Sequence, residues 1–355
     1  MVGPDPAVAR VRAGVRDLLE RLLADGTLAP GALLLVACSG GADSIALASQ
    51  TAFLAPRLGL HAGAAVVDHG VRPDSAAVAA RAAATCAALA LDPVLVRRVP
   101  DLPRASETAA REARYVELDA AREQVGATGV LLGHTLDDQA ETVLLAAGRG
   151  SGTRSLAGMS EVRGTYWRPL LGVRRSDTHQ TCAALDLSCD VDPSNAVDGP
   201  WRRSDGGPVP RAAVRDVVLT ALGDALGRDP APALARTARL AQADADLLDE
   251  LATAAWTRCL VDREDGADGA AVLLDVDALA AEPAAFRTRV LRRAALVAGA
   301  PGVALLESHV RALESLVIDW RGQGEVALPG RVGGRRDCGR LVVARPAGRT
   351  DRLPS

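Results

Sequence analysis

The residues best suited to chemistry form a run of small and polar side chains after an apolar stretch at 32–37. The run is Ser39, Gly40, Gly41, Ala42, Asp43 and Ser44. Glycines let the backbone turn sharply and approach a ligand closely, and the N-terminus of a following helix attracts phosphate. Asp43 would repel a bare phosphate, so the run favours a phosphate site that also holds Mg²⁺. The alternative is an ordinary turn in which Asp43 caps the helix.

A second group of candidate residues follows another apolar stretch. His134, Asp138 and Glu141 fall on one face of a helix that begins near Leu136, and Asp137 lies one turn below Glu141. Adjacent carboxylates can share Mg²⁺ or hold an ammonium group. The alternative is ordinary capping, because acidic residues at the start of a helix are favourable.

The elements that would position these residues alternate along the first half of the chain. Strands are predicted at 32–37, 61–67, 94–99 and 129–133, with a possible fifth at 165–171, and helices at 44–55, 74–90, 106–125 and 136–147. This alternation is typical of an α/β fold with a parallel, doubly wound sheet. Asp68 and His69 end the second strand, where such sheets bind ligands. Alone they indicate a turn, but three polar clusters at three strand ends indicate a site.

The second half of the chain has a different pattern. Residues 193–210 are rich in Pro, Gly, Ser and Arg and indicate a linker or mobile loop. Beyond them we expect helices at 211–226, 231–258, 284–297 and 305–320, a strand at 272–276, and short β segments from 321 to 345. We therefore predict a catalytic domain at 1–220, a smaller, mainly helical domain with a basic β tail at 221–345, and a flexible tail at 346–355.

The composition excludes several kinds of chemistry. All 41 basic residues are Arg, so there is no Walker A lysine and no lysine Schiff base. A bound phosphate must be held by backbone N–H groups, hydroxyls, Arg or a metal. None of the six Cys forms a C-x-x-C pair, which argues against a zinc or iron–sulfur site. No signal peptide or long apolar run is recognised, so we expect a cytoplasmic protein without a membrane partner.

The motifs together resemble a known family. They are S-G-G-x-D-S at 39–44, D-H-G-x-R at 68–72, R-E-A-R-Y at 111–115, G-H-x-x-D-D-Q-x-E-T at 133–142, R-P-L-L at 168–171 and D-P-S-N at 192–195. The first resembles the PP-loop (N-type ATP pyrophosphatase) superfamily. The full set resembles the tRNA(Ile)-lysidine synthases in their shorter form. The resemblance is dense over 32–225 and diffuse beyond.

This resemblance implies an enzyme that uses ATP and Mg²⁺ to adenylate the wobble cytidine of the CAU anticodon of tRNA(Ile). Free L-lysine then displaces AMP, and the decoding changes from AUG to AUA. For ATP, the resemblance implies residues 39–44 with Asp68 and His69, and for Mg²⁺ it implies Asp43 and Asp138. The catalytic residues would be Asp43, Asp138, His134 and Arg111. Lysine would be bound by Asp137 and Glu141. Arg211 and Arg215 would contact tRNA, and the basic tail adds Arg335 and Arg336.

Two departures and two alternatives accompany this interpretation. The family commonly has an R-x-R-x-R run, but here Ala213 stands at its middle position, and the loop before it is long. Another base-adenylating enzyme of the superfamily, a tRNA thiolase, is one alternative; those resembling 2-thiocytidine synthetase depend on C-x-x-C cysteines. The other alternative is a regulatory protein that holds ATP without turnover. The carboxylate pair argues against it, because a passive binder needs fewer acids beside a triphosphate.

Overall fold

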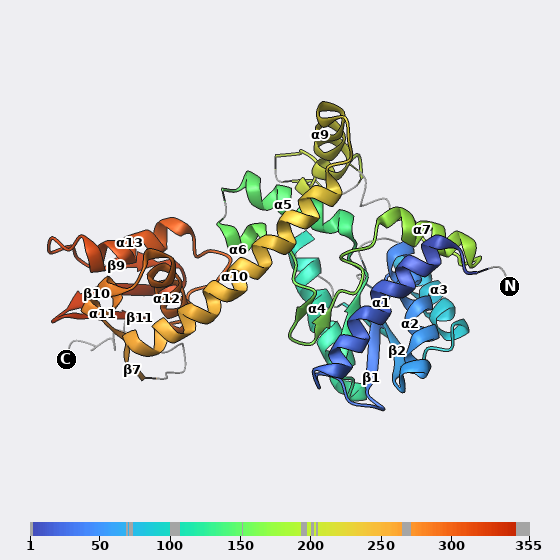
Figure 1. Ribbon diagram of the computed structural model, residues 1–355, viewed down its shortest axis with the longest axis horizontal. Coiled ribbons are helices and arrows are strands. Elements are labelled where there is room, and N and C mark those ends of the chain that lie inside the picture. Colours follow the sequence, from blue (N-terminus) through green and yellow to red (C-terminus); the bar gives the residue numbers. More distant parts are fainter. Residues whose placement is uncertain are drawn as a thin grey trace, which may run out of the picture. The chain divides into compact units, whose positions relative to one another are not determined.

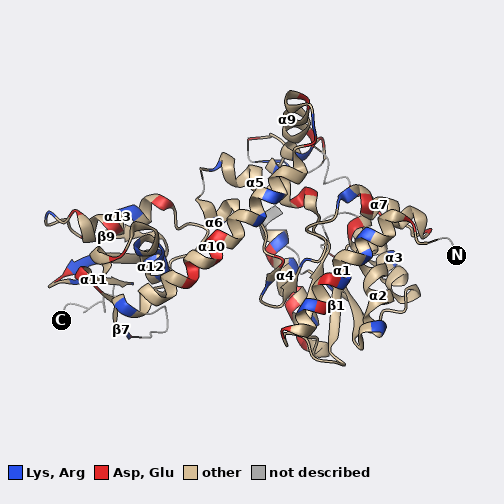
Figure 2. Cartoon of the chain, in the orientation of Figure 1, with Lys and Arg blue, Asp and Glu red and all other residues tan. Residues whose placement is uncertain are grey.

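The computed structural model describes residues 3–68, 70, 74–99, 107–150, 152–192, 197–199, 202–203, 205–264 and 271–345. The chain divides into two compact units, Met1–Gln242 and Ala243–Ser355 (Figure 1). Acidic and basic residues are mixed along the helices of both units, in keeping with the small net charge of −3 (Figure 2). Among the described residues, no helix has the length and apolar character needed to span a membrane.

The first unit is built on a six-stranded sheet in the order β3-β2-β1-β4-β6-β5. Its strands are β1 (Leu33–Ala37), β2 (His61–Asp68), β3 (Val94–Arg98), β4 (Gly129–Leu132), β5 (Val162–Arg163) and β6 (Tyr166–Trp167). All neighbours pair in parallel except β5, which runs antiparallel to β6. The predicted parallel α/β sheet is confirmed. The possible fifth strand is shorter than expected, because only residues 166 and 167 pair with β4.

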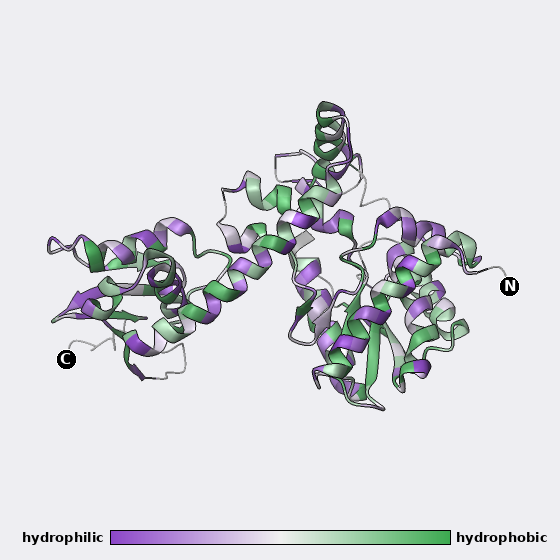
Figure 3. Ribbon diagram, viewed as in Figure 1, coloured by the Kyte–Doolittle hydropathy of each residue, from purple (hydrophilic) through white to green (hydrophobic). Residues whose placement is uncertain are grey.

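Helices cover both faces of this sheet. The helices of the first unit are α1 (Pro6–Ala24), α2 (Ala42–Leu54), η1 (Ala55–Leu58), α3 (Ser75–Ala88), α4 (Glu107–Val125), α5 (Leu136–Gly148), α6 (Thr153–Leu156), α7 (Arg175–Ala184), α8 (Pro210–Ala213), η3 (Val214–Val218) and α9 (Leu219–Leu226). Helix α10 (Ala231–Cys259) begins in the first unit and ends in the second. Leu34 and Val36 of β1 pack in one core with α1, α2 and α3, whereas Leu35 packs with Leu118 of α4. Because alternate side chains of β1 are buried on opposite faces, the strand is apolar throughout (Figure 3).

The second unit contains a five-stranded antiparallel sheet in the order β7-β8-β11-β10-β9. Its elements are β7 (Leu260–Glu264), β8 (Ala271–Asp275), α11 (Val276–Ala281), α12 (Ala284–Val297), α13 (Glu307–Ile318), β9 (Val326–Leu328), η4 (Pro329–Arg331), β10 (Val332–Asp337) and β11 (Arg340–Ala344). The three β segments expected in a basic tail thus join β7 and β8 in one sheet. Its core includes Leu274, Leu313 and Leu341, each fully buried. The domain boundary at residue 220 stays a prediction.

The sheet topology brings two of the expected polar clusters together. From β1 the chain moves to β2 and β3 on one side, and it returns to β4 on the other side. Ala37 at the end of β1 lies opposite Leu132 at the end of β4. The segments that follow these two residues therefore leave the sheet side by side, at the switch point where open α/β sheets bind ligands.

Candidate active site

The loop between β1 and α2 leaves the start of the helix open. Gly41 is the N-cap of α2, and no side chain caps the helix there. The Ser44 hydroxyl closes the loop by accepting a hydrogen bond from Ser39 N–H (3.1 Å) and donating one to the Gly41 carbonyl (2.9 Å). Gly40 has a φ of +88°, in the left-handed region that favours glycine. Backbone amides and two hydroxyls at the positive end of a helix suit phosphate oxygens.

The end of β4 packs directly against the first turn of α2. A Cβ atom added to Gly133 would lie 3.1 Å from the backbone carbon and oxygen of Asp43 and 3.2 Å from the backbone nitrogen of Ser44. A larger residue would push the two segments apart. Gly133 therefore lets the chain that follows β4 run close beside the carboxylate of Asp43.

Asp43 lies in the first turn of α2 and is not its N-cap. Its carboxylate accepts a short hydrogen bond from the Thr178 hydroxyl, and Oδ2 lies 3.6 Å from Nε of Arg175. Burial raises the pKa of Asp43, and the nearby negative charge of Asp138 adds to this effect, while Thr178 and Arg175 oppose it. Asp43 is thus a carboxylate held where its negative charge is incompletely compensated.

Asp138 combines a structural contact with a charged one. Its Oδ2 accepts hydrogen bonds from the backbone N–H (2.8 Å) and the hydroxyl (2.9 Å) of Thr135, which forms a capping box at the start of α5. Its Oδ1 lies 2.9 Å from Nη2 of Arg175. Burial alone would raise the pKa of Asp138, but the Arg175 guanidinium and the Thr135 N–H together hold it below its usual value. The capping alternative and the charged site are therefore both present.

Glu141 is fully buried and surrounded by three arginines. Arg215 binds both carboxylate oxygens, at 2.6 and 3.0 Å. Nε of Arg211 lies 3.1 Å from Oε2, and Nη2 of Arg175 lies 3.3 Å from Oε1. Arg211 and Arg215, predicted to contact tRNA, thus lie at the same cluster as the residue predicted to bind lysine.

Asp137 is paired with the neighbouring arginine of α7. Arg174 donates to both of its oxygens, at 3.1 and 2.8 Å, and the backbone N–H of Arg175 donates to Oδ2 at 2.7 Å. Arg174 also bonds Asp229, which lies just before α10. The predicted roles of Asp137 and Glu141 in lysine binding stay predictions, and in this structure arginine occupies both carboxylates.

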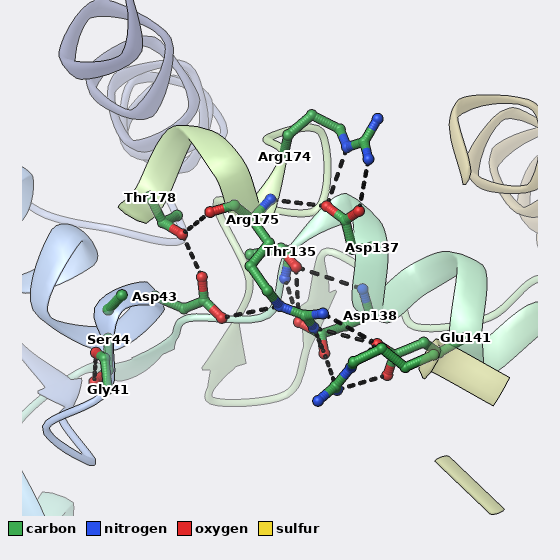
Figure 4. A network of polar contacts seen from close by, with 12 residues as sticks. Gly41, Asp43, Ser44, Thr135, Asp137, Asp138, Glu141, Arg174, Arg175 and Thr178 are labelled. Carbon is green, nitrogen blue, oxygen red and sulfur yellow. Dashed lines mark hydrogen bonds and ion pairs between the residues drawn. The ribbon is translucent and has the colours of Figure 1, made fainter. Parts of the chain in front are cut away.

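Helix α7 was not predicted from the sequence, nor were its residues Arg175 and Thr178 and its N-cap Arg174, which complete the site (Figure 4). Arg174 and Arg175 stand at its start, and Thr178 follows one turn later. One signal could have revealed them. Three acidic residues at 137–141 require cations, and all Lys and Arg positions of the chain are arginine. This arginine pair stands two residues after the R-P-L-L motif at 168–171.

His134 is bonded by an arginine other than those that bind the carboxylates described above, Arg168. Its Nδ1 accepts a hydrogen bond from Nε of Arg168 at 3.2 Å. Burial lowers the pKa of His134 to about 3; Asp138 opposes this shift, while Arg168, Arg114 and Arg111 add to it. The imidazole is therefore neutral near pH 7 and carries its proton on Nε2. Arg111 itself lies on α4, where it bonds the Tyr115 hydroxyl at 3.3 Å.

Asp68, His69 and two arginines of the second unit were also predicted as site residues. Asp68 is buried at the end of β2, and its carboxylate accepts a hydrogen bond from Gly70 N–H at 2.9 Å. His69 lies outside the described residues. In the second unit, Arg335 is exposed on β10, whereas Arg336 is half-buried and donates to the carbonyls of Leu316 and Val317 at the end of α13. The predicted tRNA contacts of these two arginines stay predictions.

Comparison with solved structures identifies the architecture of the first unit. The U34-tRNA thiolase NcsA from Methanococcus maripaludis superimposes with a TM-score of 0.52 at 16% identity, over 66% of this chain and 80% of that one. A likeness at this level of identity shows the shared fold alone.

Comparison with sequence families is more specific. Residues 14–204 match the PP-loop domain, and residues 274–342 match the TilS substrate binding domain. The tRNA(Ile)-lysidine synthase of Streptomyces coelicolor is 46% identical, over 96% of this chain and 99% of the relative. That of Thermobifida fusca is also 46% identical, over 97% and 99%. The chain therefore belongs to the tRNA(Ile)-lysidine synthases, a family of ATP-dependent ligases built on the PP-loop domain.

Proposed function

We propose that this enzyme joins free L-lysine to the wobble cytidine of the CAU anticodon of tRNA(Ile) through an adenylated tRNA, with release of pyrophosphate and AMP. The observation that carries the proposal is the meeting of two groups at the ends of β1 and β4. An open helix N-terminus suited to phosphate lies beside the carboxylates of Asp43 and Asp138. A nucleotide and an amine substrate need these two kinds of group in one place.

Asp43 and Asp138 fit the Mg²⁺ that we propose for this site. Both carboxylates are directed at one cation, the Arg175 guanidinium, so they already share a position for positive charge. Carboxylate and phosphate oxygens are the ligands that Mg²⁺ prefers. Within the described residues no group of three His, Cys, Asp or Glu could hold a metal ion, so nucleotide phosphates would complete the ligand set. When bound, the ion would polarise the phosphate that is attacked.

In the first step, the cytidine attacks the α-phosphorus of ATP and pyrophosphate leaves. The amides of the loop at 39–44 bind phosphate oxygens, and fixed donors of this kind stabilise charge that develops in the transition state. His134 is neutral, so we propose that it acts as a hydrogen-bond donor through Nε2 and not as an acid. Arg111 and Asp68 remain proposed contacts of the substrates.

In the second step, the ε-amine of lysine replaces AMP on the cytidine. We propose Asp137 and Glu141 as contacts of the ammonium group. Because arginine occupies both carboxylates, the lysine ammonium must replace one guanidinium as the partner of a carboxylate oxygen. The amine must lose a proton before it attacks, and a neighbouring carboxylate is the acceptor that we propose.

ATP labelled at the α-phosphorus tests this function directly. With an unmodified CAU-anticodon tRNA(Ile) and no lysine, we expect label to join the tRNA as pyrophosphate is released. Subsequent addition of lysine should release the label as AMP. The Asp43→Asn variant is the control for background label. Absence of any tRNA-dependent pyrophosphate release would contradict the proposal. Label that lysine fails to release would support the adenylation step and contradict the ligation step.

A further inference from the structure

Arg175 makes a set of contacts that neither the sequence motifs nor the family comparison assigns to it. Nη2 of its guanidinium lies 2.9 Å from Asp138 Oδ1 and 3.3 Å from Glu141 Oε1. Nε lies 3.6 Å from Asp43 Oδ2. One side chain thus connects the helix that follows the phosphate loop with the helix that carries the acidic pair (Figure 4).

The backbone of Arg175 is fixed independently of its guanidinium. Its N–H donates to Asp137 Oδ2 at 2.7 Å. Its carbonyl lies 2.7 Å from the Thr178 hydroxyl, whose one proton is shared between this carbonyl and the Asp43 carboxylate. The Arg175 side chain is 24% exposed to solvent. The guanidinium can therefore change partners by side-chain rotation while the start of α7 stays in place.

The three carboxylates depend on Arg175 to different degrees. Glu141 keeps Arg215 and Arg211 when Arg175 leaves. Asp138 keeps the two hydrogen bonds from Thr135, and its Oδ1 has only a distant second cation, Arg215 at 3.9 Å. Asp43 keeps the bond from Thr178. The oxygens for which Arg175 is the nearest cation are thus those of the proposed Mg²⁺ pair, Asp43 Oδ2 and Asp138 Oδ1.

We propose that Arg175 is a positioning residue that holds Asp43 and Asp138 together in the nucleotide-free enzyme and yields them to the divalent metal when the nucleotide binds. A guanidinium and a divalent ion cannot occupy the same carboxylate oxygens, because like charges repel at such distances. Once released, the guanidinium pairs with a phosphate oxygen of the nucleotide, for which its planar fork is well suited. This inference rests on the proposed metal site.

The exchange has two consequences of opposite sign. Without nucleotide, Arg175 competes with the metal, so its removal should strengthen metal binding. With nucleotide, Arg175 contributes to phosphate binding, so its removal should weaken nucleotide binding. A residue that merely maintained the shape of the site would weaken both interactions when removed.

The test measures the affinity of the full-length enzyme for Mn²⁺ by electron paramagnetic resonance. For Arg175→Gln without nucleotide, we expect Mn²⁺ to bind about tenfold more tightly than to the unaltered enzyme, the effect of one charge-assisted hydrogen bond. ATP in the presence of Mn²⁺ should bind about tenfold more weakly. Arg174→Gln is the matched control: it removes the same charge one residue away, but Arg174 bonds Asp137 and Asp229. Its Mn²⁺ affinity should change by less than about twofold.

Unchanged or weaker Mn²⁺ binding by Arg175→Gln would overturn the proposal, as would an equal gain in Arg174→Gln. Arg175→Lys keeps the charge and replaces the Gln variant if that variant unfolds. A Mn²⁺ affinity between that of the unaltered enzyme and the tenfold gain expected for Arg175→Gln supports the exchange. An affinity below that of the unaltered enzyme opposes it. Asp138→Asn separates this proposal from the metal site itself. If Asp138→Asn binds Mn²⁺ and ATP like the unaltered enzyme, Asp43 and Asp138 are not the metal ligands, and the proposed exchange at Arg175 is wrong as well. The labelling experiment on tRNA tests the ligation activity independently of this result.

Discussion

At the scale of single residues, the four carboxylates of the site have different partners and cannot substitute for one another. Asp137 and Glu141 are bound by arginine through both oxygens. Asp43 and Asp138 share one guanidinium, and each has one oxygen held by a threonine. The pair Asp43 and Asp138 is therefore the one best placed to exchange its cation during a reaction cycle.

Replacing either member of this pair should remove activity without removing the fold. In Asp43→Asn and Asp138→Asn, the amide oxygen can still accept from Thr178 or Thr135, but the negative charge is lost. We expect lysine incorporation into tRNA to fall by at least about 100-fold. The melting temperature should show that the protein remains folded. Asp177→Asn is the control, because it removes a carboxylate of α7 that pairs with Arg10. Near-normal turnover in either site variant would remove that residue from the mechanism.

His134 provides a prediction about pH. Its pKa is about 3 in the folded protein, whereas an unperturbed histidine has a value of about 6.5. Above pH 6.5 both states are neutral, so its contribution to stability is fully present there. As the pH falls towards 3, only the unfolded state takes up the proton, and stability is lost. The unfolding free energy of His134→Asn should fall less steeply over this range than that of the unaltered enzyme. Parallel curves, or an imidazole that titrates near pH 6.5 by NMR, would contradict the assignment.

At the scale of elements, the start of α5 serves both folding and chemistry. Thr135 is fully buried, caps the helix, and orients Asp138 through two hydrogen bonds. Gly133, two residues earlier, permits the contact with α2. The geometry of the carboxylate pair therefore depends on one short turn after β4.

Thr135→Val tests this dependence. The variant keeps the shape of the side chain and loses the cap, so we expect the unfolding free energy to fall by about 1 kcal/mol. Activity should also fall, because Asp138 loses the hydroxyl that orients it. Thr85→Val is the control: its hydroxyl bonds back to the Arg81 carbonyl in the last turn of α3. Equal effects of the two substitutions on stability and activity would show that the cap has no special role.

The elements also show what local sequence could and could not predict. The strands β1 to β4 and their helices were predictable, because apolar runs alternate with helical patterns. Helix α7 was not, since it is short and polar and its buried residues include Asp177 and Thr178. Strand β7 was missed because residues 261–264 are exposed and three of them, Asp262, Arg263 and Glu264, are charged. The arginine partners of Glu141 lie 34 to 74 residues away along the chain, and no local pattern encodes such contacts.

At the scale of the whole molecule, each unit matches a separate family domain, and the second matches one described as substrate binding. Its sheet presents the exposed Arg335 on β10. Arg336 instead holds two carbonyls at the end of α13 and lies over the Trp320 ring. These two neighbouring arginines should therefore differ in what they contribute.

We expect Arg335→Gln to weaken tRNA binding and to reduce the salt-dependence slope by about 1, with no change in stability. Arg336→Gln should lower the melting temperature, because two carbonyls lose their donor. Arg311→Gln on α13, an exposed arginine paired with Glu307, is the control for charge alone. Binding is measured by titration of labelled tRNA at several salt concentrations. An unchanged slope for Arg335→Gln would remove this residue from the tRNA interface.

The central claim is that the site at the ends of β1 and β4 performs lysine ligation on one tRNA. The most direct measurement is the incorporation of radiolabelled lysine into unmodified CAU-anticodon tRNA(Ile), with and without ATP. The methionine tRNA, which has the same anticodon, is the control. We expect label that depends on ATP, that appears only in tRNA(Ile), and that is lost in Asp138→Asn. Absence of lysine label under conditions in which the tRNA stimulates pyrophosphate release would contradict it and point to a different second substrate.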